Sequence, residues 1–245
     1  MRLLGSAIVL FLASASALAG DAPKYAPHVS RMATSHAFFK KNDAPDFWKL
    51  IGYYIPQTDL HACAPTALTM LLNAMRADRA LGASDKLITG KDLVAKVDIS
   101  KEGSDPGVRG VSLEGFGRIL ATGMKKFEVE GWSHEVVRTT EHSDAALKKL
   151  RDLLARNEKS GDDFIMPLYF QADITGDPEG AVGHFAPIAA FDGKRVLLLD
   201  PDREWYEPYW VPLEILYKGM TNSRMDAGKA GGYIRVWRNS PPAKS

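Results

Sequence analysis

Apolar residues recur at helical spacing in the first half of the chain. The clearest set follows Cys63 and consists of Leu68, Leu71, Leu72 and Met75. Pro65 suits a first helical turn, where a missing N–H costs little, so we predict a helix that begins near Cys63–Ala64. Two more helices are predicted over 89–97 and 111–123, the second with Ser112 as its N-cap.

The hydrophobic period changes in the second half. A short helix or turn is expected within 47–59, a first strand within 127–139 and a strongly amphipathic helix within 142–161. After these segments, apolar and polar residues alternate with a period of two. The alternating segments are 164–171, 184–191, 195–200 and 232–238, and a short helix is expected over 211–220. Because Asp192-Gly193 is a hairpin signal, we predict an α+β fold of two lobes, with a helical first half and an antiparallel β second half.

The first nineteen residues follow a different pattern. Arg2, an apolar run and the small-x-small sequence Ala17-Leu18-Ala19 are typical of a secretory signal peptide cleaved after Ala19. We expect a periplasmic or secreted bacterial protein without stable membrane association after cleavage. Residues 20–46 are expected to form a loosely ordered arm, and residues 47–240 the main folded domain.

Composition and charge limit the classes of function that the chain can have. The chain has 31 basic and 30 acidic residues, a formal net charge of +1 and no obvious basic stripe. This composition is that of a globular protein and gives no support for nucleic-acid binding. A single cysteine excludes a cluster of thiolate metal ligands within one chain. We also expect no metal site and no cofactor.

The lone cysteine needs an explanation in an exported chain, because oxidising compartments favour paired cysteines. Cys63 is either buried and inert, joined to a second chain, or chemically used. The third alternative gains weight from its place at a predicted helix N-terminus, where unpaired N–H groups favour a thiolate. A nearby imidazolium would favour the thiolate further.

Of the six histidines, His184 is the one predicted to meet Cys63, because it opens a strand that is otherwise apolar. The others are expected to face solvent. A hairpin loop over 191–193 would set His184 opposite Asp200, whereas a tight two-residue turn would set Pro201 there. A carboxylate beside the ring would orient it and stabilise the imidazolium. Gln57, six residues before Cys63, could share an oxyanion hole with the Cys63 N–H.

The order Gln, Cys, His, Asp along the chain is papain-like. The sequence around these residues resembles the phytochelatin synthase (glutathione γ-glutamylcysteinyltransferase) family. The resemblance spans roughly 49–237 and is carried by the stretches "QTDLHACAPTALTMLLNA", "GHFAPIAAFD" and "VLLLDPDREWYEPYWVPLEILYKGM". It implies a papain-like fold with Cys63 as nucleophile, His184 as base, Asp200 as orienting acid and Gln57 as oxyanion amide.

The resemblance also implies a substrate. The Cys63 thiolate would attack the Cys–Gly peptide of glutathione, glycine would leave, and water or a second glutathione would take the γ-glutamylcysteinyl group. Plant members carry a cysteine-rich C-terminal domain, whereas this chain ends soon after Trp237, so hydrolysis is expected more than phytochelatin synthesis. A role in metal detoxification would act through heavy-metal–glutathione thiolates as substrate.

Two positions depart from the family pattern. Ala64 follows the nucleophile where the family usually has glycine, and Gly231 stands where the family tends to place an arginine that recognises the γ-glutamyl group. Ser112 and Asp226 are the remaining candidates for substrate contact. Two rival functions stay open, namely a papain-like peptidase acting on other peptides and a non-catalytic periplasmic module in which Cys63 forms mixed disulfides.

Overall fold

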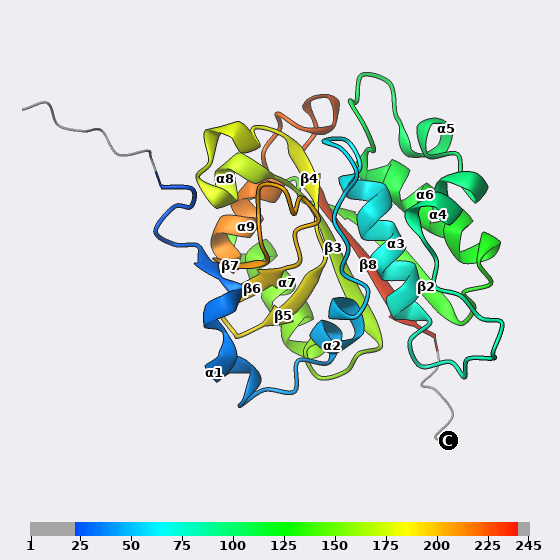
Figure 1. Ribbon diagram of the computed structural model, residues 1–245. Coiled ribbons are helices and arrows are strands. Elements are labelled where there is room, and N and C mark those ends of the chain that lie inside the picture. The colour runs from blue at the N-terminus through cyan, green and yellow to red at the C-terminus, as the bar shows by residue number, and fades with distance from the viewer. Residues whose placement is uncertain (1–22, 240–245) are drawn as a thin grey trace, which may run out of the picture.

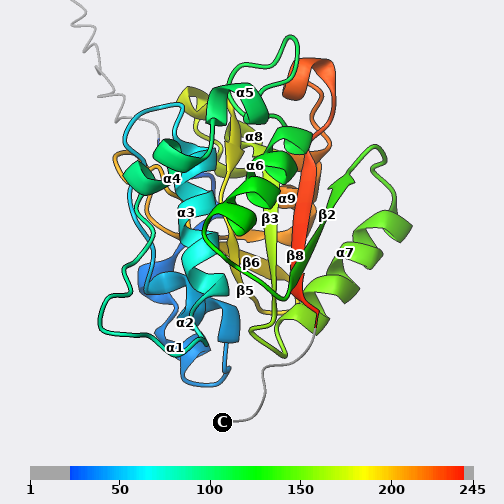
Figure 2. The same cartoon turned by 90° about the vertical axis from the view of Figure 1, so that its right-hand side faces the viewer.

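The computed structural model describes residues 23–239, in which helices cover both faces of an antiparallel sheet (Figures 1 and 2). The helices are α1 His36–Phe39, α2 Pro45–Ile51, α3 Cys63–Met75, α4 Gly90–Lys96, α5 Ile99–Gly103, α6 Leu113–Lys126, α7 Asp144–Asn157, α8 Gln171–Thr175 and α9 Leu213–Met220. The strands are β1 Ser30–Arg31, β2 Trp132–Arg138, β3 Asp163–Phe170, β4 Gly183–Phe185, β5 Ile188–Phe191, β6 Arg195–Leu198, β7 Tyr209–Pro212 and β8 Gly232–Arg238.

The sheet order is β1-β7-β6-β5-β3-β8-β2, with β4 paired to β3 beside this path. Every described strand pair is antiparallel, as predicted. One core fills the space between the sheet and helices α2, α3 and α6, and a second core packs α7 and α9 on the other face. The α+β class predicted from the sequence is therefore confirmed.

Helix α3 is the element that carries Cys63, and its position is firmly set by burial. It begins at Cys63, as the apolar spacing and Pro65 predict, and eleven of its thirteen residues are buried. Leu68, Leu71 and Leu72 are fully inaccessible, and burial of each such side chain contributes about 1.5–3 kcal/mol. The helix consequently presents its N-terminal turn at a fixed place.

The strand predicted over 184–191 is interrupted. Strand β4 pairs with β3, whereas β5 pairs chiefly with β6, and Ala186 and Pro187 form the break between them. A proline has no N–H to donate to a ladder, so the chain changes partner there. Strand β7 was not predicted, although its aromatic residues are typical of a strand.

The described part of the N-terminal arm differs from the expected loose arm. Strand β1 pairs with β7, and Ser35 Oγ accepts a hydrogen bond from the indole N–H of Trp210 at 2.5 Å. His28 Nε2 lies 2.8 Å from the carbonyl oxygen of Ile174. Residues 23–46 thus close one edge of the sheet rather than hang free of it.

The signal peptide predicted over 1–19 lies outside the described residues. Within residues 23–239, none of the helices combines the length and the apolar character needed to cross a bilayer.

Candidate active site

Cys63 occupies the first position of helix α3. Its side chain is half-buried, and among the described residues no side chain caps this end of the helix. The N–H groups of Cys63 and Ala64 have no carbonyl acceptor within the helix, and Pro65 has no N–H to offer. The helix therefore directs a partial positive charge and free donors at the sulfur and at any oxyanion beside it.

His184 lies on strand β4, opposite Tyr169 of β3. Its Nε2 is 2.8 Å from Oδ1 of Asp200, and the two residues are 3% and 0% exposed. Burial by itself lowers the pKa of His184, but the charge and hydrogen bond of Asp200 outweigh it and hold that pKa well above its usual 6.5. Cys63 is among the groups that raise it, so the sulfur lies within electrostatic reach of the ring.

Asp200 is held by several donors besides the imidazole. Oδ1 also accepts the N–H of Asp202 at 2.9 Å, and Oδ2 accepts the Gln171 amide and the Tyr209 hydroxyl, both at 3.0 Å. Burial raises the pKa of this carboxyl, yet the charge of His184 and the hydrogen bonds bring it below its ordinary value. The geometry therefore favours a carboxylate facing an imidazolium.

The sequence predicted this pairing through a hairpin register that the structure does not have. Neither alternative is correct, because Phe191 pairs with Val196 and the turn runs over Gly193-Lys194. Asp192 accepts the N–H groups of the two residues after Gly193, which shortens and shifts the turn. His184 reaches Asp200 because the break after Phe185 displaces β4 from the hairpin.

Gln57 lies on the loop that leads to helix α3. Its N–H donates to the carbonyl oxygen of Pro201 at 2.7 Å, which ties the loop to the segment after Asp200. The side-chain Oε1 is buried and has no hydrogen-bond partner within residues 23–239. The amide borders the same cavity as Cys63 and His184, so the structure brings all four predicted catalytic residues to one place.

That cavity has a volume of about 820 Å³. Cys63, His184 and Gln57 border it, and two groups of residues form its other walls. One wall comes from 107–111 and 224–228, and the other from 179–182 and 205–206 with Lys24. A volume in this range is that of a small-molecule or peptide site.

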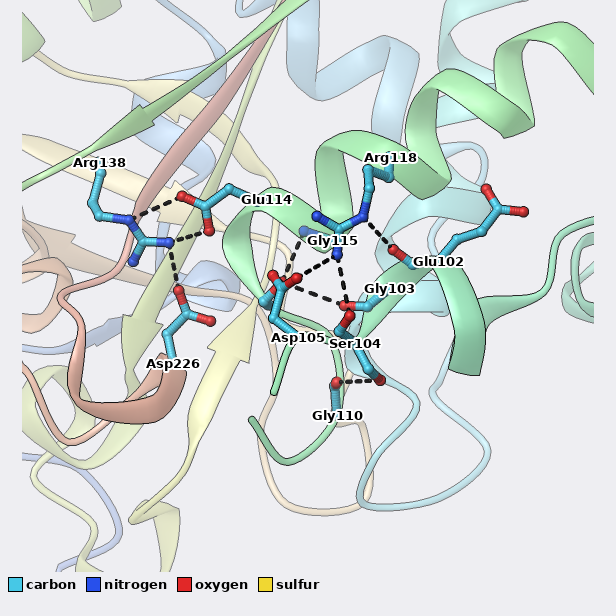
Figure 3. A network of polar contacts seen from close by, with 11 residues as sticks. Glu102, Gly103, Ser104, Asp105, Gly110, Glu114, Gly115, Arg118, Arg138 and Asp226 are labelled. Atoms are coloured by element: carbon cyan, nitrogen blue, oxygen red, sulfur yellow. Dashed lines mark hydrogen bonds and ion pairs between the residues drawn. The ribbon is translucent and has the colours of Figure 1, made fainter. Parts of the chain in front are cut away.

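Asp226 contributes a buried carboxylate to the first wall. Its Oδ2 lies 2.6 Å from Nη2 of Arg138, a residue that also binds Glu114, as Figure 3 shows. Oδ1 is buried and without a partner in the described part of the chain. Asp226 and Ala227 both adopt left-handed φ angles, 50° and 58°, a strained turn of the kind that collects at functional sites.

Ser112 has a different place from the one expected of a substrate contact. It is 1% exposed, caps helix α6 by accepting the N–H of Gly115 at 2.8 Å, and donates to Asp105. Arg118 binds the same aspartate at 2.8 Å, and Figure 3 shows this network beside the loop 104–110. Ser112 is absent from the cavity lining formed by the described residues, so the geometry supports an N-cap and not a substrate contact.

Gly231 cannot be replaced by a larger residue on this backbone. A Cβ atom there would lie 2.2 Å from the carbonyl oxygen of Leu168. The guanidinium nearest to Asp226 comes instead from Arg138, at the end of β2 and opposite Gly232. Sequence spacing did not indicate this, because residues 138 and 226 meet only through the β2–β8 pairing.

The supports of Asp200 were also missed. Gln171 and Tyr209 are fully or almost fully buried polar side chains, and both donate to Oδ2. A signal did exist, since Gln171 ends an apolar strand segment and Tyr209 falls in the aromatic stretch after Asp200. Among residues 23–239, no three His, Cys, Asp or Glu side chains lie close enough together to hold a metal ion.

A helix-borne cysteine and a buried histidine–aspartate pair, with Cys63 and His184 bordering one cavity of an α+β scaffold, define a protein of the cysteine–histidine–aspartate class. Sequence comparison gives the family. The phytochelatin synthase family model matches residues 29–233, and the chain belongs to this family.

Curated relatives agree with this assignment. The chain is 24% identical over 207 residues to glutathione γ-glutamylcysteinyltransferase 1 of Arabidopsis thaliana, a match that covers 81% of this chain and 38% of the relative. It is 27% identical over 192 residues to glutathione γ-glutamylcysteinyltransferase 3 of Lotus japonicus, covering 78% and 37%. The chain thus spans well under half the length of these relatives.

One solved structure that matches part of the chain is described as a C39-like peptidase from Bacillus anthracis. The TM-score is 0.41 at 14% identity, and the match covers 78% of this chain and 95% of that one.

Proposed function

We propose that the protein transfers the γ-glutamylcysteinyl group of glutathione through a thioester on Cys63, with release of glycine. The observation that carries the proposal is the buried His184–Asp200 contact of 2.8 Å beside a cavity that Cys63 also borders. The names of the curated relatives supply the substrate.

The chemistry follows from the hydrogen bonds. An Nε2–H donated to Asp200 leaves Nδ1 of His184 to take the thiol proton, which produces a thiolate–imidazolium pair. The thiolate then attacks the Cys–Gly carbonyl carbon. The Cys63 N–H and the Gln57 side-chain amide stabilise the resulting oxyanion by hydrogen bonds. As the C–N bond breaks, the imidazolium gives its proton to the glycine nitrogen.

The cavity offers complementary charges to the donor half of glutathione. The γ-glutamyl group carries one ammonium and one carboxylate. Asp226 presents a buried carboxylate oxygen without a partner among the described residues, and Arg109 and Arg224 border the same wall. In this assignment Asp226, which the sequence analysis names as a candidate for substrate contact, binds the ammonium, and Arg138 keeps the carboxylate in place.

We further infer that water, more than a second glutathione, takes the acyl group. Cys63 is half-buried, and these 245 residues contain no second thiol that could gather a metal–thiolate acceptor. Any heavy metal would enter as a glutathione thiolate, that is, as part of the substrate. The location proposed for this reaction is the periplasm, on the basis of the N-terminal sequence.

The test is incubation with glutathione, followed by quantification of glycine and γ-glutamylcysteine. Wild type should release equal amounts of both, whereas Cys63→Ala should release neither. Phytochelatin as the main product would refute the preference for water but keep the transfer step. Cleavage of other peptides without glycine release from glutathione would favour the peptidase alternative. A slow thiol that alkylates only near pH 8.5 would favour a non-catalytic module.

A further inference from the structure

Three exposed apolar side chains border the catalytic cavity. Leu60, Val182 and Trp205 are 70%, 49% and 53% exposed, although large apolar side chains normally avoid water. We call these three residues the apolar rim.

The apolar rim is built from the segments that carry the catalytic residues. Leu60 lies three positions before Cys63, Val182 two before His184, and Trp205 five after Asp200. The rim therefore belongs to the cavity that Cys63 and His184 border and is not a separate surface.

Each wall is held together by its own contacts, and Met225 of the first wall also packs toward Gly183. Gly107 packs toward the Cβ of Ala227, which joins the loop 107–111 to the turn that contains Asp226. On the other wall, Gly180 approaches the hydroxyl of Tyr206, which joins 179–182 to the segment of Trp205. The Lys24 ammonium lies over the Trp205 and Tyr206 rings, 5.1 and 4.5 Å from their centroids, and also pairs with Asp177.

Charge and burial together favour one placement of the substrate. The single ammonium of a γ-glutamylcysteinyl peptide lies in the acyl half, and the carboxylate oxygen that is buried without a partner among the described residues of the first wall belongs to Asp226, whereas Glu179 of the second wall is exposed. In this placement the acyl half contacts Asp226 and leaves the apolar rim for the residue on the other side of the scissile bond. Glycine has no side chain with which to contact that rim.

We propose that the apolar rim is a subsite for an apolar leaving residue, so that γ-glutamylcysteinyl peptides ending in leucine or phenylalanine are better substrates than glutathione. This inference rests on the proposed function. The step itself is unchanged: the Cys63 sulfur bonds to the carbonyl carbon, the peptide C–N bond breaks, and His184 protonates the departing amino nitrogen. Water later cleaves the thioester.

The experiment compares γ-Glu-Cys-Gly, γ-Glu-Cys-Leu and γ-Glu-Cys-Phe with the full chain, by chromatography of the released amino acid. The expected kcat/KM for the leucine and phenylalanine peptides exceeds that for the glycine peptide about tenfold, the range that a hydrophobic subsite provides. Trp205→Ser and Val182→Ser should bring this ratio toward one.

Matched controls separate a subsite from a general surface effect. Trp48 and Val94 are 61% and 58% exposed and do not belong to the cavity lining within residues 23–239. Trp48→Ser and Val94→Ser should therefore keep the wild-type ratio. Equal kcat/KM for the three peptides, or a ratio unchanged by Trp205→Ser, overturns the subsite while glycine release upholds the proposed function. Failure to cleave all three overturns the proposed function itself.

Discussion

The imidazole Nε2 of His184 lies 2.8 Å from the carboxylate Oδ1 of Asp200, and both side chains are almost completely removed from solvent. A charged pair in such a place survives only when its remaining hydrogen-bonding positions are filled. Gln171, Tyr209 and the N–H of Asp202 fill them. The imidazole is consequently held in one orientation, with its second nitrogen left for Cys63.

The pH dependence of turnover should report this contact. Activity requires a protonated His184 to expel the amine, and the pKa of His184 is raised well above 6.5. The alkaline limb of kcat/KM for glutathione should therefore lie well above pH 6.5. In Asp200→Asn the burial that lowers the pKa is no longer opposed by a full charge, so the limb should move to lower pH. At pH values above this limb, each pH unit by which the limb moves changes kcat/KM about tenfold.

A matched control for that profile is Asp152→Asn, at an exposed position of helix α7. It should leave the limb in place. A limb at the same pH in wild type and Asp200→Asn would show that the carboxylate does not sustain the imidazolium.

Gln57→Ala should lower kcat about 10²–10³-fold with little change in KM, because an oxyanion donor acts in the transition state. The alkylation rate of Cys63 by iodoacetamide should stay near that of wild type, since the thiolate does not depend on this amide. Steady-state kinetics together with alkylation rates give the measurement. A variant whose KM rises while kcat stays unchanged would instead place Gln57 in substrate binding.

Arg138→Met should lower the free energy of unfolding by about 3 kcal/mol, because it leaves the buried carboxylate of Asp226 without its counterion. Asp226→Asn should cost less, since Arg138 keeps Glu114. The double variant should regain most of the loss, which chemical denaturation can measure. Simple addition of the two single losses would argue that the ion pair contributes nothing.

The raised pKa of the Glu158 carboxyl should make the free energy of unfolding depend on pH. Burial raises its pKa to about 7 from 4.5, and one oxygen accepts the Phe191 N–H at 2.6 Å. The folded state binds this proton more tightly than the unfolded state, so stability falls as pH rises from 4.5 through 7. Glu158→Gln should be more stable than wild type at pH 8 by on the order of 1 kcal/mol, allowing for partial exposure.

The advantage should vanish below pH 4.5, where wild type is protonated in both states. Glu130→Gln, at an exposed position, should show no such pattern in denaturant titrations across the same pH range. A pH-independent difference would exclude the titration of Glu158 as its cause.

The sequence predicts a structural feature correctly where the residues of a single segment determine it. The start of helix α3 follows from Pro65 and the apolar spacing after it, and Ser112 was recognised as an N-cap. The role of Ser112 beyond the cap could not be predicted, because its contact with Asp105 depends on how a loop folds back. The same limit applies to Arg138, which meets Asp226 only across a strand pair.

The break between β4 and β5 shows why a correct contact can follow from an incorrect register. Alternation continues through Ala186 and Pro187, so periodicity alone indicates one strand. The change of partner depends on β3 and β6, whose relative positions no local pattern encodes. His184 and Asp200 therefore meet as expected, but by another path.

The most direct test of the thioester is intact-protein mass spectrometry after acid quenching of a reaction with glutathione. The account predicts a mass increase of one γ-glutamylcysteinyl group, on a peptide that contains Cys63, and its absence in Cys63→Ala. Glycine release by Cys63→Ala at the wild-type rate, with no such adduct on the wild-type chain, would contradict it.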